Sequence, residues 1–411
     1  MFSAVGAVRY LASGRGVFDP ICDLIIRPPR AQYDPAMDLG PDIFRIGDDD
    51  ATRYTRADLT LYNMRGMAVQ CSWFRPLTGS RRPCVVYLHG NCGSRYDALE
   101  ALFLLRHGFT LFALDASGSG VSDGEFISLG FYERQDLAAV VEYLAGQPDV
   151  DGIGLWGRSM GAVTAIMYAA KDTSIKCIVC DSPFSTLRLL IKDLVRRHGS
   201  KRIPSVIVDN IVDRIRKRIA KRAAFDIDDL DALKYASECA APAFIFHGAD
   251  DDFVLPMHSV AVHDAFKGSC LHHIVEGGHN DERDESVQNT IANFFTLYLI
   301  LKPEGERDRE KDPKPVIVKG RIEKTIQIPT SRTTPPGTSL KASEATSSSI
   351  EGAEWDETSA NSKTYAPLVP ISFTKPRLRD ATRSSSPPSS PSLPAKENQG
   401  DVDNEKEKSS T

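Results

Sequence analysis

The sequence predicts an α/β fold with a mostly parallel sheet flanked by helices. Two observations support this prediction. Between about residues 58 and 302, short apolar runs alternate with stretches of helical spacing, and such alternation is typical of strand–helix–strand units whose strands lie parallel in one sheet. Hydrophobic residues also make up 41% of the 411 residues, which is enough for a sizeable core.

Eight apolar runs are expected to form the strands of this sheet. They are residues 58–62, 69–74, 84–88, 109–114, 153–156, 175–180, 243–246 and 271–275. Helical spacing fills most of the intervals, over residues 98–106, 131–144, 162–170 and 286–301. About 184–238 shows no strand pattern, so we expect a helical insertion there that caps one edge of the sheet.

Composition divides the chain into three parts. Beyond Lys302 the residues are mainly Ser, Thr, Pro, Lys and Glu, which bury too little apolar surface to offset the entropy lost on folding. We therefore predict an N-terminal extension over 1–24, an α/β domain over 25–302 and a disordered tail over 303–411. The tail is expected either to bind signalling partners or to serve as an unmodified spacer.

Charge and cysteine usage exclude several classes of protein. The net charge is only −5, which favours no nucleic-acid partner, and no apolar run approaches the ~18 residues of a membrane span. The eight cysteines follow no disulfide framework, so a reduced, cytoplasmic setting is expected. Cys177 and Cys180 form a C-x-x-C motif on a predicted strand. Residues three apart on a strand point to opposite faces, so we interpret both as core residues rather than a metal site.

The pentapeptide Gly157-Arg158-Ser159-Met160-Gly161 is the most informative motif. It joins a short apolar strand to a helix of small residues, as in the strained elbow that exposes a nucleophilic serine. The two glycines let the strand and the helix pack closely around the turn. A motif this short also occurs by chance, so its meaning depends on partners elsewhere in the chain.

A serine hydroxyl needs a base and an acid to become a nucleophile, and the chain supplies both after Ser159. Three aspartates, 250–252, follow the predicted strand 243–246, and His279 lies in a glycine-rich loop after the last predicted strand. Parallel sheets place active-site groups at the carboxyl ends of their strands. Asp181, which also follows a strand, is an alternative acid.

Acyl transfer also needs N–H donors that stabilise the charge on a tetrahedral intermediate. The amide of Met160, the residue after the serine, is one expected donor. The second is expected in the loop 89–94, where two glycines allow a tight backbone and where Asn91 is the preferred donor. His89 and His247 are expected to shape turns.

These motifs together resemble the α/β-hydrolase superfamily, and most of all its ABHD-type, serine-aminopeptidase-like branch. The resemblance spans about residues 25–300, and the stretch 26–35 is similar to the start of plant and protist members. The motifs that carry it are His89-Gly90-Asn91, the run 115–122, the pentapeptide around Ser159, Asp181 to Phe184, His247-Gly248 with Asp251, and 278–281.

The resemblance implies a role for each residue of a triad. By it, Ser159 is the nucleophile, His279 is the base and Asp251 is the acid. The acid in this family usually lies four residues after the histidine of the His-Gly pair, which selects Asp251. On the residues alone, Asp250 and Asp252 remain alternatives. The resemblance implies no metal and no organic cofactor.

The leading hypothesis is a serine hydrolase that cleaves an ester, thioester or amide bond through an acyl-enzyme. A carboxylic-ester, acyl-thioester or lipid substrate is favoured, carried by a small molecule or by an acylated protein. Two alternatives stay open: a peptidase similar to serine aminopeptidases, and a non-catalytic interaction protein on the same fold.

The predicted cap contains a basic amphipathic stretch. Five apolar residues follow helical spacing between 207 and 219, and six Arg or Lys residues cluster between 214 and 222. Such a helix can lie on an anionic membrane, which would place the protein peripherally at its surface. Alternatively, the apolar face packs on the sheet and the charges are solvated, and we favour this second interpretation.

Overall fold

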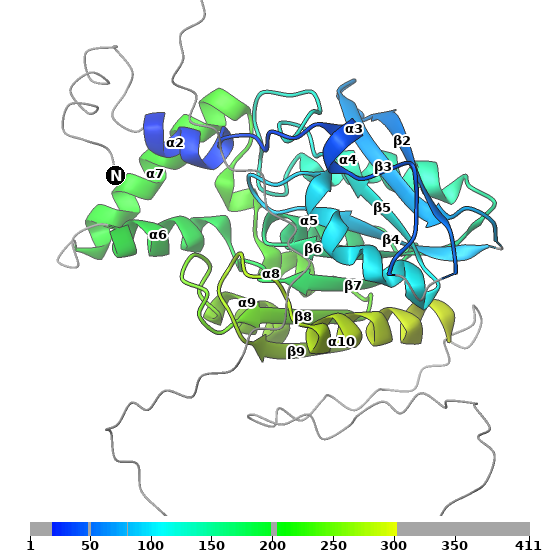
Figure 1. Ribbon diagram of the computed structural model, residues 1–411. Coiled ribbons are helices and arrows are strands. Elements are labelled where there is room, and N and C mark those ends of the chain that lie inside the picture. The colour runs from blue at the N-terminus through cyan, green and yellow to red at the C-terminus, as the bar shows by residue number, and fades with distance from the viewer. Residues whose placement is uncertain (1–18, 48–50, 80, 199–203, 302–411) are drawn as a thin grey trace, which may run out of the picture. The chain divides into compact units, whose positions relative to one another are not determined.

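A single sheet of nine strands organises the protein (Figure 1). The computed structural model describes residues 19–47, 51–79, 81–198 and 204–301, all of which belong to one compact unit. The predicted tail, 303–411, lies outside the described residues. The strands are β1 (Ile43–Phe44), β2 (Tyr54–Tyr62), β3 (Ala68–Pro76), β4 (Arg82–Leu88), β5 (Thr110–Leu114), β6 (Val150–Arg158), β7 (Ile175–Asp181), β8 (Ala243–Gly248) and β9 (Cys270–Val275).

The sheet is mostly parallel, as predicted. Its order is β1-β2-β3-β5-β4-β6-β7-β8-β9. The six strands β4 to β9 are parallel to one another. At one edge, β1 pairs antiparallel with β2, β2 with β3, and β3 with β5. The eight predicted strands are all present. The ninth, β1, has two residues, too few to give a sequence pattern.

Helices cover both faces of the sheet and bury an apolar core against each. The helices along the sheet are α4 (Glu133–Ala145), α5 (Met160–Ala169), α9 (Met257–Ala265), α10 (Glu285–Phe295), a 3₁₀ helix η1 (Arg95–His107) and a π-helical turn η3 (Thr296–Ile300). One core contains α4 and α5, and the other contains η1 and α10. On β7, Cys177 belongs to one core and Cys180 to the other, so the two thiols point to opposite faces.

The predicted insertion is helical and forms the cap. It contains α6 (Leu187–His198), α7 (Ser205–Ala223), a short 3₁₀ turn η2 (Ile227–Asp229) and α8 (Ala232–Ala236). The apolar stripe of α7 faces inward, with Val208, Val212, Ile215 and Ile219 buried. Arg216, Arg218 and Arg222 of the clustered cations form ion pairs with aspartates of the described chain. Contact with an anionic membrane therefore stays a prediction, since part of the required surface is used internally.

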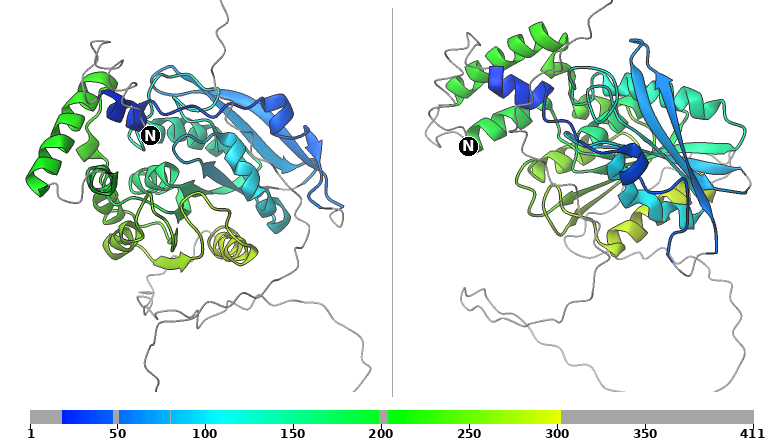
Figure 2. Two further views of the ribbon diagram at one scale, coloured as in Figure 1. Left: turned by 60° about the vertical axis from the view of Figure 1, so that its left-hand side comes forward. Right: turned by 45° about the horizontal axis from the view of Figure 1, so that its top comes forward.

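The boundary predicted between residues 24 and 25 falls inside a helix. Helix α2 (Asp19–Ile26) lies beside α7 of the cap (Figure 2). Asp19 accepts two hydrogen bonds from Arg218, and Asp23 accepts one from Arg222. Residues from Asp19 onward thus belong to the folded part, because these ion pairs and the buried side chains of Cys22 and Ile26 hold α2 against the cap. In the described part of the chain, no helix is both long and apolar enough to cross a membrane.

Candidate active site

A strained turn at Ser159 joins β6 to α5. Ser159 has φ 52° and ψ −110°, a backbone conformation that residues other than glycine adopt only when their surroundings impose it. The flanking glycines allow the close approach. A Cβ on Gly157 would lie 2.1 Å from the carbonyl oxygen of Gly161, and a Cβ on Gly161 would lie 2.0 Å from that of Leu88. A side chain at Gly157 would therefore force β6 and α5 apart, and one at Gly161 would force α5 away from the end of β4.

Three residues from distant parts of the chain meet at this turn. His279 Nε2 lies 3.1 Å from the hydroxyl oxygen of Ser159, and His279 Nδ1 lies 2.6 Å from Oδ2 of Asp251. Because a carboxylate accepts at Nδ1, that nitrogen carries the proton and Nε2 is free to accept the serine proton. The serine is 6% exposed and Asp251 is 3% exposed, so the three groups interact largely out of water.

The carboxylate of Asp251 is held by four donors. Its Oδ1 accepts from the backbone N–H groups of Phe253 and Val254, each at 2.9 Å, and its Oδ2 faces His279 and His247. Burial raises the pKa of Asp251, but the hydrogen bonds from His247 and His279 outweigh it and hold the pKa well below its ordinary value. The carboxylate therefore stays ionised and orients the imidazole.

Sequence reasoning missed the role of His247. The sequence predicts that it shapes a turn, and it does donate from Nε2 to the carbonyl oxygen of Val254 at 2.7 Å. The same nitrogen lies 2.9 Å from Asp251 Oδ2, and the side chain is fully buried. Its position four residues before the acid was the available signal. His89 behaves as expected, since among the described residues its ring bonds to the backbone of Gly90 and Ala116.

The alternative acids lie elsewhere or are occupied. The side chain of Asp252 is 78% exposed and pairs with Arg197 of the cap. Asp250 is exposed, and its backbone N–H donates to the carbonyl oxygen of Gly277. Asp181 is buried, but both of its oxygens face Arg283 at 2.8 and 3.0 Å. Among the described contacts of the His279 ring, Asp251 is its carboxylate partner.

The two expected oxyanion donors border the serine. Met160 begins α5, where helix N–H groups lack acceptors inside the helix. The loop that carries Asn91 passes close by, since a Cβ on Gly90 would lie 3.8 Å from the Cβ of Ser159. Within the residues that the structure describes, neither the Asn91 amide nor the Met160 amide donates a hydrogen bond.

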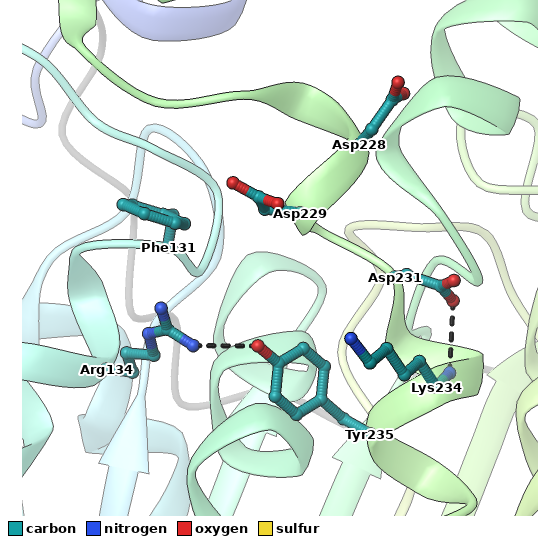
Figure 3. Close-up of a pocket in the computed structure, with 7 residues that line it drawn as sticks. All are labelled: Phe131, Arg134, Asp228, Asp229, Asp231, Lys234 and Tyr235. Carbon is teal, nitrogen blue, oxygen red and sulfur yellow. Dashed lines mark hydrogen bonds between the residues drawn. The ribbon is translucent and has the colours of Figure 1, made fainter.

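One pocket among the described residues lies away from these groups. A pocket of about 270 Å³ opens between α4 and the cap, where Arg134 donates to the hydroxyl of Tyr235 at 3.0 Å (Figure 3). A hollow of about 10 Å³ lies directly behind the turn and is lined in part by His89, Met160 and Gly161. None of the described residues forms a cluster of three or more His, Cys, Asp or Glu side chains that could hold a metal ion.

Comparisons with known proteins agree with this architecture. The family model described as X-Pro dipeptidyl-peptidase (S15 family) matches residues 50–231, a range that includes Ser159 and ends before Asp251. The uncharacterized protein YqkD of Bacillus subtilis is 28% identical over 219 residues, which cover 51% of this chain and 70% of that protein. The lysophosphatidylserine lipase ABHD12 of Gallus gallus is 27% identical over 128 residues, which cover 28% of this chain and 32% of the lipase.

A solved structure shares the fold over most of the described chain. The esterase Pf2001 of Pyrococcus furiosus superposes with a TM-score of 0.52 at 21% identity, covering 67% of this chain and 98% of the esterase. Similarity at that identity concerns the fold, and activity has to be argued from the site itself. The sheet order, the turn at Ser159 and these matches agree, and the chain belongs to the α/β-hydrolase superfamily.

Proposed function

We propose that this protein is a serine hydrolase that works through an acyl-enzyme, with Ser159 as nucleophile, His279 as base and Asp251 as acid. The observation that carries the proposal is the continuous line of contacts from Asp251 through the imidazole to the serine oxygen, at 2.6 and 3.1 Å. Both distances are within hydrogen-bonding reach, which is the geometric requirement for an activated nucleophile.

The proposed reaction proceeds in two acyl transfers. The Ser159 oxygen attacks the substrate carbonyl carbon while its proton moves to His279 Nε2, and the amides of Asn91 and Met160 stabilise the resulting oxyanion. The imidazolium then protonates the leaving alcohol, thiol or amine as the tetrahedral intermediate collapses to the acyl-enzyme. A water molecule, deprotonated by His279, repeats the attack and releases the carboxylic acid.

The favoured substrate is a carboxylic ester, an acyl-thioester or a lipid. A relative that is named a lysophosphatidylserine lipase supports the lipid class. A peptidase is the second candidate, and the match to the S15 family model over residues 50–231 supports it. Hydrolysis by the purified full-length chain of a matched set, in which one acyl group is linked as an ester, a thioester and an amide, distinguishes these candidates by kcat/KM.

Labelling with a fluorophosphonate tests the nucleophile. The wild type is expected to react covalently, and Ser159→Ala is expected to lose all labelling. Ser259→Ala is a matched control, because Ser259 is also buried and its hydroxyl also lies 3.0 Å from a histidine, His272, yet no carboxylate orients that pair among its recorded hydrogen bonds. A wild type that stays unlabelled, or a Ser159→Ala variant that still reacts, would contradict the proposed function.

A further inference from the structure

Asp181 lies beside the catalytic groups without belonging to them. It ends β7 and is paired in register with Arg158, the last residue of β6. The backbone N–H of Ser159 donates to the carbonyl oxygen of Asp181 at 2.8 Å. The main chain of the nucleophile is therefore fixed to this residue, while the carboxylate of the same residue points to other partners.

Arg283 is the first of these partners. Its Nε and one terminal nitrogen donate to the two oxygens of Asp181 at 3.0 and 2.8 Å, and its other terminal nitrogen donates to the carbonyl oxygen of Gly278 at 3.2 Å. The next residue, Asp284, caps α10 through the N–H of Val287. Arg283 thus extends from a rigid helix start and holds the residue before His279.

Arg158 is the second partner. One of its terminal nitrogens donates to the backbone carbonyl oxygens of His279 and Asp281, at 3.0 and 2.8 Å. Its Nε lies 3.6 Å from Asp181, and its other terminal nitrogen lies 3.3 Å from Glu100. The residue next to the nucleophile in the chain therefore holds the main chain of the base directly.

The loop that carries His279 needs such support. It contains Gly277, at φ +97°, and Gly278, and glycine-rich segments lose the most conformational entropy when they become ordered. The described contacts within the loop include only a short turn, closed by the Gly278 N–H on the carboxylate of Asp281. Planar guanidinium groups, with several donors in fixed directions, suit the task of holding adjacent carbonyls.

We propose that Arg158 and Arg283, both anchored on Asp181, are positioning residues that set the distance between the His279 imidazole and Ser159. The inference rests on the proposed function, because it concerns the base of that reaction. Asp181 then links nucleophile and base: its backbone fixes Ser159, and its carboxylate fixes the arginines that hold the His279 loop. Neither arginine contacts the reacting atoms.

Substitution by lysine tests the proposal, because lysine keeps the charge and loses the fork of donors. In the full-length protein, Arg283→Lys and Arg158→Lys are expected to lower kcat for a small ester on the order of 100-fold, as expected for a displacement of about 1 Å. KM is expected to stay within about twofold, because substrate contacts are unchanged. A merely structural role would reduce the amount of folded enzyme and leave kcat per labelled site unchanged.

Arg56→Lys is the matched control. Arg56 is as buried as Arg283, pairs with Asp42 and Asp58, and donates to the backbone carbonyl of Gly40, but it lies at the β1–β2 edge of the sheet. Its kcat per active site, counted with the fluorophosphonate, is expected to equal that of the wild type. Should Arg283→Lys fail to fold, Arg158→Lys, whose side chain is 14% exposed, decides the question.

The outcomes separate this proposal from the function on which it rests. Arginine variants that fold and lose no more kcat than Arg56→Lys would overturn the positioning role while leaving the hydrolase intact. So would a loss in kcat/KM that lies entirely in KM. A wild type without Ser159-dependent labelling would overturn the proposed function, and the positioning role with it.

Discussion

The loop of His279 and the cap both contain Arg–Asp pairs, but in different surroundings. At the loop, the side chains of Arg283 and Asp181 are 4% and 2% exposed. At the cap, Arg218 is 41% exposed where it meets Asp19 of α2, and Arg216 is 39% exposed where it meets Asp226. The residue types are the same, and the access of water differs about tenfold for the arginine side chains.

Burial changes what an ion pair contributes. A buried pair has surrendered its hydration, so loss of one partner leaves an unpaired charge in a medium of low dielectric. In an exposed pair, each charge replaces bound water by its partner, so the pair adds little to the free energy of unfolding, and salt screens it further. We infer that the loop depends on its arginines for position, whereas the cap depends mainly on the apolar stripe of α7.

The largest change in stability is expected when the buried pair of Arg283 and Asp181 is broken. Arg283→Met should reduce the free energy of unfolding by about 3–5 kcal/mol, because the buried carboxylate of Asp181 then loses both of its hydrogen bonds from Arg283 and, among the described cations, keeps only the longer contact with Arg158, at 3.6 Å. Urea unfolding of the full-length chain measures it. Adding Asp181→Asn to Arg283→Met should restore part of the stability, because the under-compensated carboxylate charge is then removed, while Arg158 keeps its pair with Glu100. A loss below about 1 kcal/mol would show that water reaches this pair as it reaches the cap pairs.

The next effect tests the apolar attachment of the cap. Ile215 on α7 is fully buried, so Ile215→Ala should cost about 2–4 kcal/mol through lost transfer energy and the cavity left behind. Ile207→Ala, on the same helix but 50% exposed, should change the stability by less than about 0.5 kcal/mol. Equal effects from the two substitutions would contradict an inward-facing stripe.

The features that follow local patterns could be predicted from the sequence. The periodicity of apolar residues predicted the strands of the sheet. The chain order of Ser159, 250–252 and His279 predicted which side chains meet at the turn around Ser159. The selection of Asp251 came from resemblance, since three adjacent aspartates carry no local difference. In the structure they differ because Val254 and His247 lie beside only one of them.

Contacts that depend on the folded geometry were not predictable. Arg158 lies within the serine motif and Arg283 lies four residues after His279, but nothing local indicates that both guanidinium groups meet on Asp181. That convergence requires β6, β7 and the start of α10 to be in place. The docking of α2 on the cap was missed for the same reason, because Asp19 and Arg218 are 199 residues apart.

A third prediction concerns His272, a histidine whose burial makes the stability of the protein depend on pH. Burial first, and then the neighbouring imidazoles of His263 and His247, lower the pKa of His272 to about 4, from 6.5. Below pH 6.5 the unfolded chain takes up a proton that the folded state resists, so the stability present at neutral pH is lost as the pH falls toward 4. From pH 7 to pH 5, the wild type should lose about 1 kcal/mol more than His272→Gln, an amount reduced for the partial exposure of the ring. Urea unfolding at both values measures it, and parallel losses would contradict the shift.

The smallest change in stability is the most informative for the comparison of the His279 loop with the cap, because it separates the contribution of burial from that of charge. Arg218→Met removes a cation that bonds Asp19 at 2.7 Å, yet the arginine is 41% exposed, and the loss should be only about 0–1 kcal/mol. That loss should shrink further between 0.05 and 1 M NaCl, because salt screens exposed charges, whereas the loss caused by Arg283→Met should hardly change with salt. If both losses responded to salt alike, the two attachments would share one mechanism, and the dry environment of Asp181 could not explain why the base of the reaction is held by arginine.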